Sequence, residues 1–159
     1  MEFRFAWGRH DQKLVDDARQ FWREQDVMSP EDIEARAKDL CVLAYSSGRV
    51  AAASTVYLYD FPRLRSRFAY YRTLVGADFR RQKLSARLCV FSRDAMKQWA
   101  RENPEEKLKG LFIIPEAEEY RPHLHEPVIR RHGLEFVLVG YTPGGYQMRV
   151  VWFDDATVE

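Results

Sequence analysis

The residues with the clearest chemical potential lie between 74 and 88, where an apolar run is followed by a cationic turn and a helical pattern. Arg80, Arg81 and Lys83 stand in the turn. The first N–H groups of a helix have no partner inside the helix, and the helix dipole adds roughly half a positive charge there. Phosphates bind at such ends, and arginines add charge-assisted hydrogen bonds. The segment predicts an anion site, although an ordinary turn with solvated arginines has the same composition.

The charge around this turn is one-sided, although the whole chain, with 25 Lys plus Arg and 24 Asp plus Glu, has a net charge of only +1. Between Phe61 and Arg87, eight cations stand against the single anion Asp78. These cations are Arg63, Arg65, Arg67, Arg72, Arg80, Arg81, Lys83 and Arg87. The interleaved aromatic residues also suit nucleic-acid stacking, but the nearly balanced total charge disfavours a nucleic-acid partner. A small anionic ligand or a merely solvated surface remain the alternatives.

Arg72 stands midway along the apolar run from Arg67 to Val75. A buried guanidinium needs a carboxylate or phosphate partner, so Arg72 is expected either to pair with an internal acid or to recognise an acidic acceptor. Nearby tyrosines can line an acceptor pocket, but packing between neighbouring strands explains them as well. They are Tyr57, Tyr59, Tyr70 and Tyr71.

Metal chemistry is not expected. His123, His125 and His132 lack a further ligand at a recognisable spacing. The two cysteines, Cys41 and Cys89, lie in apolar surroundings, which predicts buried reduced thiols rather than a disulfide framework or a zinc site.

The elements that must position the turn follow from hydrophobic periodicity. A short strand opens the chain at Phe3 and Phe5, and a helix spans roughly 12–24. Ser29 and Pro30 begin a second helix, which ends near residue 38. β-Favouring runs cover 40–45, 50–59, 67–75 and 110–114, and the first two are joined by a hairpin turn.

The same kinds of pattern predict the elements in the second half of the chain. A long helix runs from about 84 to 99 and is ended by Asn103-Pro104. Residues 128–132 are interpreted as a last helical turn with Gly133 as its C-cap. A hairpin of 135–142 with 147–153 closes the chain.

The element order is β-α-α-β-β-β-α-β-α-β-β. It predicts a single α/β (α+β) domain over residues 1–159, with a central mixed, mostly antiparallel sheet of about seven strands flanked by helices. A chain of 159 residues is long enough to bury roughly 70% of its unfolded surface. No apolar run approaches the ~20 residues of a membrane span, and no signal peptide opens the sequence, so we expect a cytoplasmic protein without membrane partners.

Element order and turn together resemble the GNAT superfamily of acetyl-CoA-dependent N-acyltransferases over nearly the whole chain. In that family a strand ends in Val-x-Pro-x-Tyr-Arg-x-x-Gly-x-Gly, whose N–H groups hold the pyrophosphate of coenzyme A. Lys83 and Ser85 stand at the glycine positions and Ala77 at the proline, whereas the other positions are family-like: Val75, Asp78, Phe79, Arg80, Arg81, Gln82, Leu84 and Leu88. Lys83 and Ser85 are expected to keep helical dihedral angles, while their side chains either crowd the pyrophosphate or contact it.

The resemblance implies an N-acetyltransferase that moves an acetyl group directly from acetyl-CoA to the amine of a small molecule or peptide, without a metal. It implies a coenzyme-binding segment made of Leu74, Val75, Arg80, Arg81, Gln82, Lys83, Leu84, Ser85 and Ala86. Backbone N–H groups near Leu74 or Val75 would stabilise the oxyanion.

The resemblance also suggests the catalytic groups. The run Ile129-Arg130-Arg131-His132-Gly133-Leu134 is similar to the family's Tyr-x-x-x-Gly-Phe, with Ile129 where a tyrosine acid often stands. Glu116, just beyond the strand that ends at Ile114, becomes the candidate base, and Tyr120 the candidate acid. An acidic turn at 116–119 is also typical of a solvated surface.

Two further expectations remain open at this stage. A non-catalytic protein of the same fold, in which coenzyme A binds weakly or not at all, is the alternative function. The exposed hairpin at 135–153 allows strand pairing across a two-fold axis, which predicts a possible homodimer.

Overall fold

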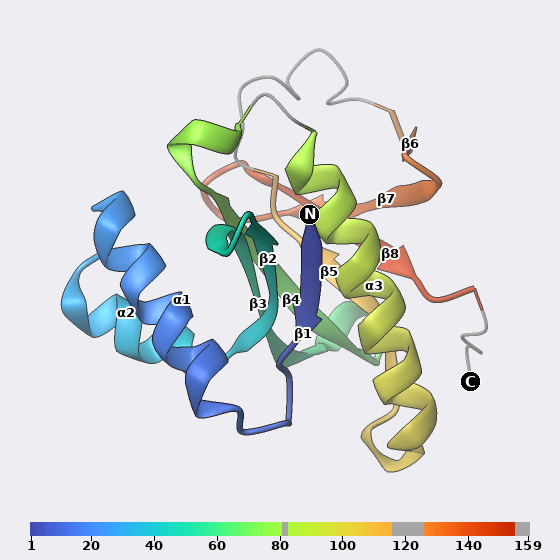
Figure 1. The fold of residues 1–159 in the computed structure, drawn as a ribbon. Helices are drawn as coiled ribbons and strands as arrows, with labels where there is room; N and C mark the ends of the chain where they lie inside the picture. Colours follow the sequence, from blue (N-terminus) through green and yellow to red (C-terminus); the bar gives the residue numbers. More distant parts are fainter. Residues whose placement is uncertain (81–82, 116–125, 155–159) are drawn as a thin grey trace. The chain divides into compact units, whose positions relative to one another are not determined.

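The computed structural model of the chain describes residues 1–80, 83–115 and 126–154. Within these ranges eight strands are hydrogen-bonded in the order β1-β2-β3-β4-β5-β8-β7-β6, and there are three α-helices (Figure 1). Two compact units are present: unit 1 comprises Met1–Tyr57 and Arg72–Ala95, and unit 2 comprises Leu58–Tyr71 and Met96–Glu159. The predicted mixed, mostly antiparallel α/β sheet with flanking helices is confirmed.

Unit 1 begins with β1 (Glu2–Phe5), which pairs antiparallel with β2 (Leu40–Ser46). A two-residue turn joins β2 to β3 (Arg49–Phe61), and both turn residues, Ser47 and Gly48, have positive φ angles of 50° and 77°. Positive φ at both central positions is the hairpin geometry that matches the twist of the strands, and glycine adopts it without steric cost. The predicted hairpin is confirmed.

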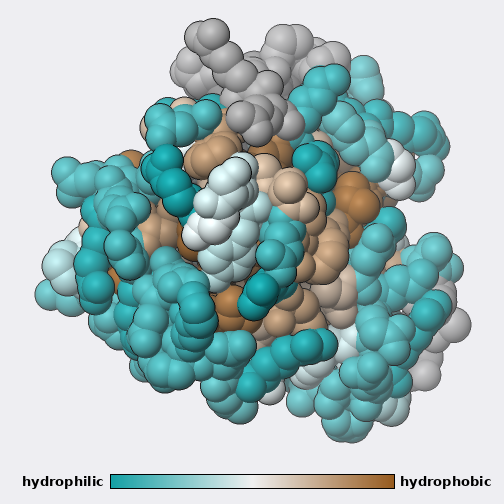
Figure 2. Space-filling view, in the orientation of Figure 1, coloured by the Kyte–Doolittle hydropathy of each residue, from teal (hydrophilic) through white to brown (hydrophobic). Residues whose placement is uncertain are grey.

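The helices α1 (Gln12–Gln25) and α2 (Pro30–Ala37) begin where polar side chains can accept backbone N–H groups. The Asp11 carboxylate accepts from Lys13 and Leu14, and the Ser29 hydroxyl oxygen accepts from Asp32. Such caps contribute about 1 kcal/mol each. The outward side of both helices is mainly hydrophilic, on the left of the view in Figure 2.

The two faces of the unit 1 strands carry different helices. One face packs against α1 and α2 through a buried cluster that includes Leu14, Phe21, Trp22, Ile33, Leu43 and Ala53. On the other face, Phe3 stacks on Phe91 of α3 (Leu84–Glu102) with ring centroids 5.2 Å apart, and the hydroxyls of Ser54 and Ser92 are hydrogen-bonded. Each fully buried large apolar side chain contributes roughly 1.5–3 kcal/mol.

Unit 2 is built on an aromatic core. The first part of β4 (Ser66–Val75) pairs in parallel with β5 (Leu108–Ile113), which pairs antiparallel with β8 (Gln147–Trp152). The buried cluster contains Phe61, Phe68, Phe112 and Val150. Gly110 permits a close approach of β5 and β8, because a Cβ there would lie 2.1 Å from the carbonyl oxygen of Val151.

The prediction of a helical turn at 128–132 was wrong. Residues Val128–Arg131 form strand β6, which pairs antiparallel with β7 (Leu134–Tyr141). His132 and Gly133 have φ angles of 51° and 77°, so Gly133 belongs to a two-residue hairpin turn and is not a helix C-cap. Four residues are too few to distinguish a period of two from a period of 3.6.

In the part of the chain that the structure describes, this correction changes the element order to β-α-α-β-β-β-α-β-β-β-β, with eight strands in place of about seven. It also places β6 at the end of the strand order, beside β7. At this end of the strand order the edge strand is therefore β6, and not a strand of the β7 and β8 hairpin on which the homodimer expectation rested. None of the helices in the described ranges is long and apolar enough to cross a membrane.

Candidate functional site

The turn that follows β4 is fixed to α1 and β3 by backbone hydrogen bonds. Gly76 donates its N–H to the carbonyl oxygen of Ala51 at 2.8 Å, and Ala77 donates to the side-chain oxygen of Gln25 at 3.0 Å. A Cβ at position 76 would lie 3.2 Å from that Ala51 oxygen and 3.3 Å from the ring of Phe21. A short 3₁₀ turn, Ala77–Phe79, follows. The core of unit 1 therefore fixes the start of the cationic turn.

The side chains of the turn present positive charge to solvent. Arg80, Lys83 and Ser85 are exposed, Ala86 is half-buried, and Leu84 is buried. Arg80 and Lys83 form no ion pair with any residue in the described ranges. The anion of the turn, Asp78, is exposed and lies 3.7 Å from Arg49. Arg81 and Gln82, also predicted to bind the coenzyme, lie outside the described residues.

The backbone at Lys83 differs from the expectation of helical dihedral angles. Its φ is 52°, and its carbonyl oxygen accepts the N–H of Arg87 at 3.3 Å, so Lys83 directly precedes the helix. A non-glycine residue in the left-handed region costs about 1–2 kcal/mol. Glycine adopts this conformation freely, which gives a physical reason for a glycine at this place in the motif. Ser85 does lie within the first turn of α3, as expected.

The last residues of β4 have no registered partner on β5. The last registered pair of these two strands is Tyr70 with Phe112, whereas β4 continues to Val75. Leu74 and Val75, the predicted oxyanion-binding residues, are half-buried near this end. Backbone N–H groups on that edge of β4 have no ladder partner in the registered pairs of β4 and β5, and they can donate to a ligand.

Several of the eight cations counted in the sequence have structural roles. Arg67 contacts Asp60 at 2.8 Å and Glu106 at 2.7 Å. The Arg87 guanidinium lies 5.4 Å from the centre of the Phe3 ring. Phe68 and Tyr71 are buried, so neither ring is available to stack on a nucleic-acid base. The cationic surface is therefore narrower than the sequence implied.

Arg72 contacts an acid of the same unit, which the sequence offered as one of two alternatives. Its guanidinium lies 3.9 Å from a carboxylate oxygen of Asp39 and 5.7 Å from the centre of the Tyr57 ring. Among the other tyrosines, Tyr59 stacks on Phe112 and Tyr70 packs against the same ring. Sequence reasoning did not identify Asp39, because the contact joins residues far apart in the chain.

The predicted catalytic residues, Glu116 and Tyr120, lie outside the described residues, as do His123 and His125. Ile129, at the position of the family's tyrosine, lies on β6 and is buried opposite Phe136. No group of three or more metal-ligating side chains occurs within the described ranges.

Cys41 and Cys89 are buried and form no disulfide, as predicted. Burial raises the pKa of each thiol to about 12. Neither cysteine is therefore a candidate nucleophile near neutral pH.

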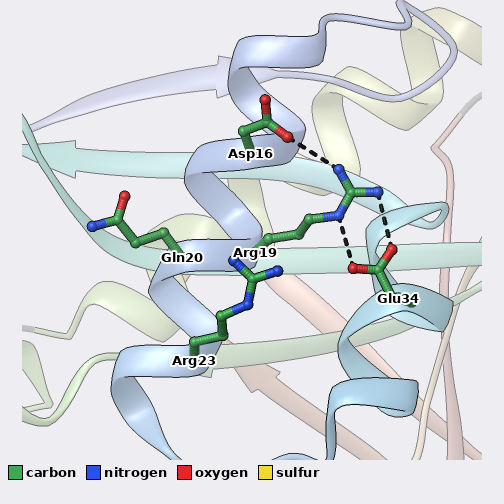
Figure 3. Close-up of a pocket in the computed structure, with 5 residues that line it drawn as sticks. All are labelled: Asp16, Arg19, Gln20, Arg23 and Glu34. Carbon is green, nitrogen blue, oxygen red and sulfur yellow. Dashed lines mark hydrogen bonds and ion pairs between the residues drawn. The ribbon is translucent and has the colours of Figure 1, made fainter.

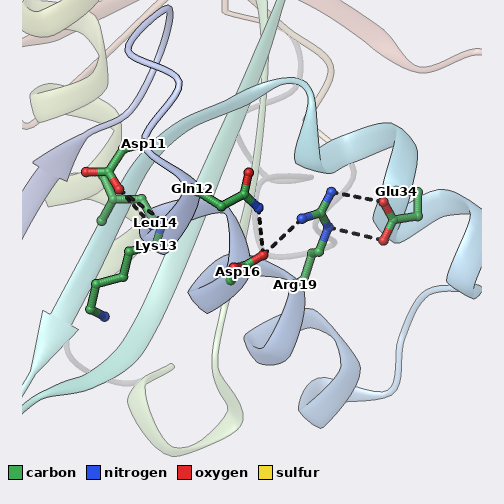
Figure 4. Close-up of polar contacts among 7 residues, drawn as sticks. All are labelled: Asp11, Gln12, Lys13, Leu14, Asp16, Arg19 and Glu34. Carbon is green, nitrogen blue, oxygen red and sulfur yellow. Dashed lines mark hydrogen bonds and ion pairs between the residues drawn. The ribbon is translucent and has the colours of Figure 1, made fainter.

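An open hollow lies on the outer side of α1 and α2 (Figure 3). Arg19 projects into it and contacts both carboxylate oxygens of Glu34 at 3.1 Å and an oxygen of Asp16 at 3.1 Å. Gln12 donates to Asp16 in the same chain of contacts (Figure 4). Arg23 also lines the hollow, so two arginines face two carboxylates, and we interpret the hollow as a surface ion-pair network.

Buried Arg149 of β8 was also missed, although it interrupts an apolar run just as Arg72 does. Its guanidinium donates to the side-chain oxygen of Gln147 at 2.9 Å, to the carbonyl oxygen of Phe136 at 2.9 Å and to that of Glu126 at 2.8 Å. Burial lowers its pKa. These contacts connect β8, β7 and the segment before β6, so we assign Arg149 a structural role.

Comparison with known proteins shows the fold. No protein-family model matches the chain, and no curated protein matches it. Among solved structures, it is similar to an acetyltransferase of the GNAT family from Streptococcus pneumoniae, with 16% identity, a TM-score of 0.51 and coverage of 96% of this chain and 97% of that one. It is also similar to Tetrahymena GCN5, with 13% identity, a TM-score of 0.50 and the same coverage. The chain therefore has the GNAT acetyltransferase fold, as its sequence resemblance predicted.

Proposed function

We propose that the protein is an N-acetyltransferase that moves an acetyl group from acetyl-CoA directly to the amine of an acceptor. Proteins with this fold are mostly acetyl-CoA-dependent N-acetyltransferases. The observation that best supports the proposal is the turn between β4 and α3, in which Arg80 and Lys83 are exposed and Lys83 directly precedes α3.

The residues of this turn fit a pyrophosphate. The first N–H groups of helix α3, at Leu84, Ser85 and Ala86, have no partner inside the helix. The Ser85 hydroxyl and the two exposed cations add donors on the same short segment. Acetyl-CoA bound here would supply the activated acetyl thioester.

The chain itself would then position the reacting groups. Backbone N–H groups near Leu74 and Val75 would donate to the carbonyl oxygen of the acyl group and stabilise its developing negative charge. Holding the amine beside the acyl carbon turns a bimolecular reaction into one within a complex. Glu116 is the proposed base and Tyr120 the proposed acid.

Thermal unfolding with and without acetyl-CoA tests this function. A ligand at about 100 times its Kd adds roughly 2.7 kcal/mol to the folded state, which raises the midpoint by about 5–10 °C for a chain of this size. Arg80→Ala should reduce the shift, whereas Arg130→Ala, which removes an exposed arginine on β6, should not. No shift at millimolar acetyl-CoA would contradict the proposal.

A transfer assay then tests the base. Glu116→Gln should slow acetyl transfer more than it weakens acetyl-CoA binding. An unchanged rate on a competent acceptor would show that another group removes the proton.

A non-catalytic protein of the same fold is the second candidate function. The apolar, buried Ile129 at the family's tyrosine position favours it. A coenzyme-induced shift without transfer to any amine would support this alternative.

A further inference from the structure

A loose ion pair stands on the α1 and α2 side of unit 1, between Arg72 of β4 and Asp39, which lies between α2 and β2. The closest nitrogen and oxygen atoms are 3.9 Å apart, and the two side chains are 32% and 26% exposed. Charge-assisted hydrogen bonds normally measure about 2.7–2.9 Å. The Arg67 and Asp60 pair, by comparison, closes to 2.8 Å. The Arg72 and Asp39 charges are therefore less tightly joined, and both side chains are partly open to solvent.

The surroundings of this pair supply further recognition elements. The Arg72 guanidinium lies over the ring of Tyr57, which is partly exposed.

The carboxylate of Asp39 is also poorly compensated. Burial raises the pKa of Asp39, and the opposing effect of Arg72 does not cancel that shift. A cation that approaches more closely than Arg72 would stabilise the ionised carboxylate.

The pair lies close to the proposed site of acyl transfer. Arg72 and Leu74 are two residues apart on β4, so their side chains share one face and their Cα atoms are about 7 Å apart. A small acceptor held by Arg72 and Asp39 would therefore have its amine within reach of an acyl group positioned at Leu74.

We propose that Asp39 and Arg72 form the acceptor-binding subsite and that the acceptor is a free amino acid, with its ammonium on Asp39 and its carboxylate on Arg72. This inference rests on the proposed acetyltransferase function. A simple amine would bring its positive charge against Arg72, and a simple carboxylate would meet Asp39. A zwitterion matches both charges at once.

Calorimetry on the intact protein saturated with coenzyme A tests the proposal. The probes are the twenty common L-amino acids, each compared with the amine that lacks its carboxylate and the acid that lacks its amine. We expect at least one amino acid to bind, and both truncated analogues of it to bind at least ~10-fold more weakly, because each leaves one charge of the pair unmatched. Failure of all twenty to bind, or equal binding of an amine analogue, would overturn the proposal.

Variants of Arg72 and Asp39 test which charged group of the amino acid each residue binds. Arg72→Met should weaken amino-acid binding ~10–100-fold and leave affinity for the amine analogue within about two-fold, and Asp39→Asn should weaken amino-acid binding ~10-fold. The matched controls are Arg19→Met and Glu34→Gln, which remove an ion pair on α1 and α2 (Figure 4) and should leave both affinities unchanged. Equal losses in the controls and the test variants would overturn the assignment.

Two measurements keep the outcome decisive. If Arg72→Met does not fold, Arg72→Lys keeps the positive charge but loses the planar fork, and it should weaken amino-acid binding ~5–10-fold. The shift of the unfolding midpoint that acetyl-CoA causes in the unaltered protein is measured separately. If acetyl-CoA raises the midpoint but no amino acid binds more tightly than its truncated analogues, only this inference is overturned. If acetyl-CoA does not raise the midpoint, the proposed function is overturned and amino-acid binding stands as an independent result.

Discussion

At the scale of single residues, Lys83 has a backbone angle that suits the glycine which it replaces in the motif. Its φ of 52° lies in the region that glycine adopts without steric cost. The sequence showed that a lysine replaces the glycine, and a helical angle was expected there. The helix begins at Leu84, as its periodicity predicted, so Lys83 lies just outside it. Side-chain spacing locates a helix start but does not give the backbone angle of the residue before it.

Lys83→Gly should therefore stabilise the protein. Relief of the left-handed strain outweighs the larger unfolded-state entropy of glycine, for a net gain of about 0.5–1 kcal/mol. Urea unfolding measures the gain. Lys83→Ala is the control, because it removes the ammonium group without relieving the strain and should not stabilise the protein.

The same two variants distinguish the two roles of Lys83 in acetyl-CoA binding. If acetyl-CoA binds more tightly to the glycine variant but not to the alanine variant, a Cβ at position 83 crowds the ligand. Weaker binding to both variants would indicate that the ammonium group contacts the ligand.

A second residue-scale prediction concerns pH. The hydroxyl of Tyr45 donates to a carboxylate oxygen of Asp17 at 2.7 Å. Burial would raise the pKa of Asp17, but hydrogen bonds from Lys13 and Tyr45 outweigh it and hold the pKa below its usual value. A lowered folded-state pKa stabilises the protein above the unfolded pKa of about 3.9, and this contribution is lost as the pH falls through the folded value.

Tyr45→Phe should therefore cost about 1 kcal/mol at pH 7, and the cost should disappear as the pH falls below about 4. Chemical denaturation of both proteins across this range measures it. Tyr146→Phe, which removes an exposed hydroxyl, should show no such dependence. A constant difference between Tyr45→Phe and the parent protein at all pH values would contradict the role of Asp17.

At the scale of elements, buried Arg149 connects two strands and the segment that precedes a third. Its three acceptors belong to β8, β7 and Glu126. Arg149→Met would leave these oxygens buried without donors, which should cost about 2–4 kcal/mol and lower the unfolding midpoint by about 5–15 °C. Arg130→Met, which removes an exposed arginine on β6, is the matched control. A loss of similar size in the control would show that the three contacts are not the cause.

The elements were predictable where neighbouring residues determine them, and not where pairing with a distant segment does. Ser29 and Pro30 correctly marked α2, and the Ser47-Gly48 turn correctly joined β2 to β3, because caps and tight turns depend on neighbours in sequence. Strand β6 was missed because its four residues depend on pairing with β7. The Asp39 contact of Arg72 was predictable only as a type of partner, since its identity depends on the tertiary fold.

At the scale of the whole molecule, element order and the cationic turn together predicted the fold. The chain shares only 16% and 13% identity with the two GNAT structures described above, so few individual residues carry the likeness. Periodicity is retained when residues change, because many apolar side chains can fill the same core position. The catalytic groups do not follow from this pattern, and the assignments of Glu116 and Tyr120 stay predictions.

The single domain expected from the sequence can be tested through the strands shared by the two compact units. Strands β3 and β4 each continue from one unit into the other without a linker, so neither unit can lose these strands without disturbing the other. We therefore predict one cooperative unfolding transition. Trp22 in the core of unit 1 and Trp152, whose ring packs on Phe68 in unit 2, are suitable reporters in variants that retain only one tryptophan.

Gly110→Ala provides the perturbation, because its Cβ would collide with the Val151 carbonyl and force β5 and β8 apart. A local defect of this kind should cost more than ~3 kcal/mol, and it should lower the urea midpoint reported by Trp22 and by Trp152 equally. Gly144→Ala, whose Cβ would lie 3.4 Å from its nearest neighbour, controls for the substitution itself. If Gly110→Ala lowers the Trp152 midpoint and leaves that of Trp22 unchanged, the two units unfold independently and the chain comprises two domains.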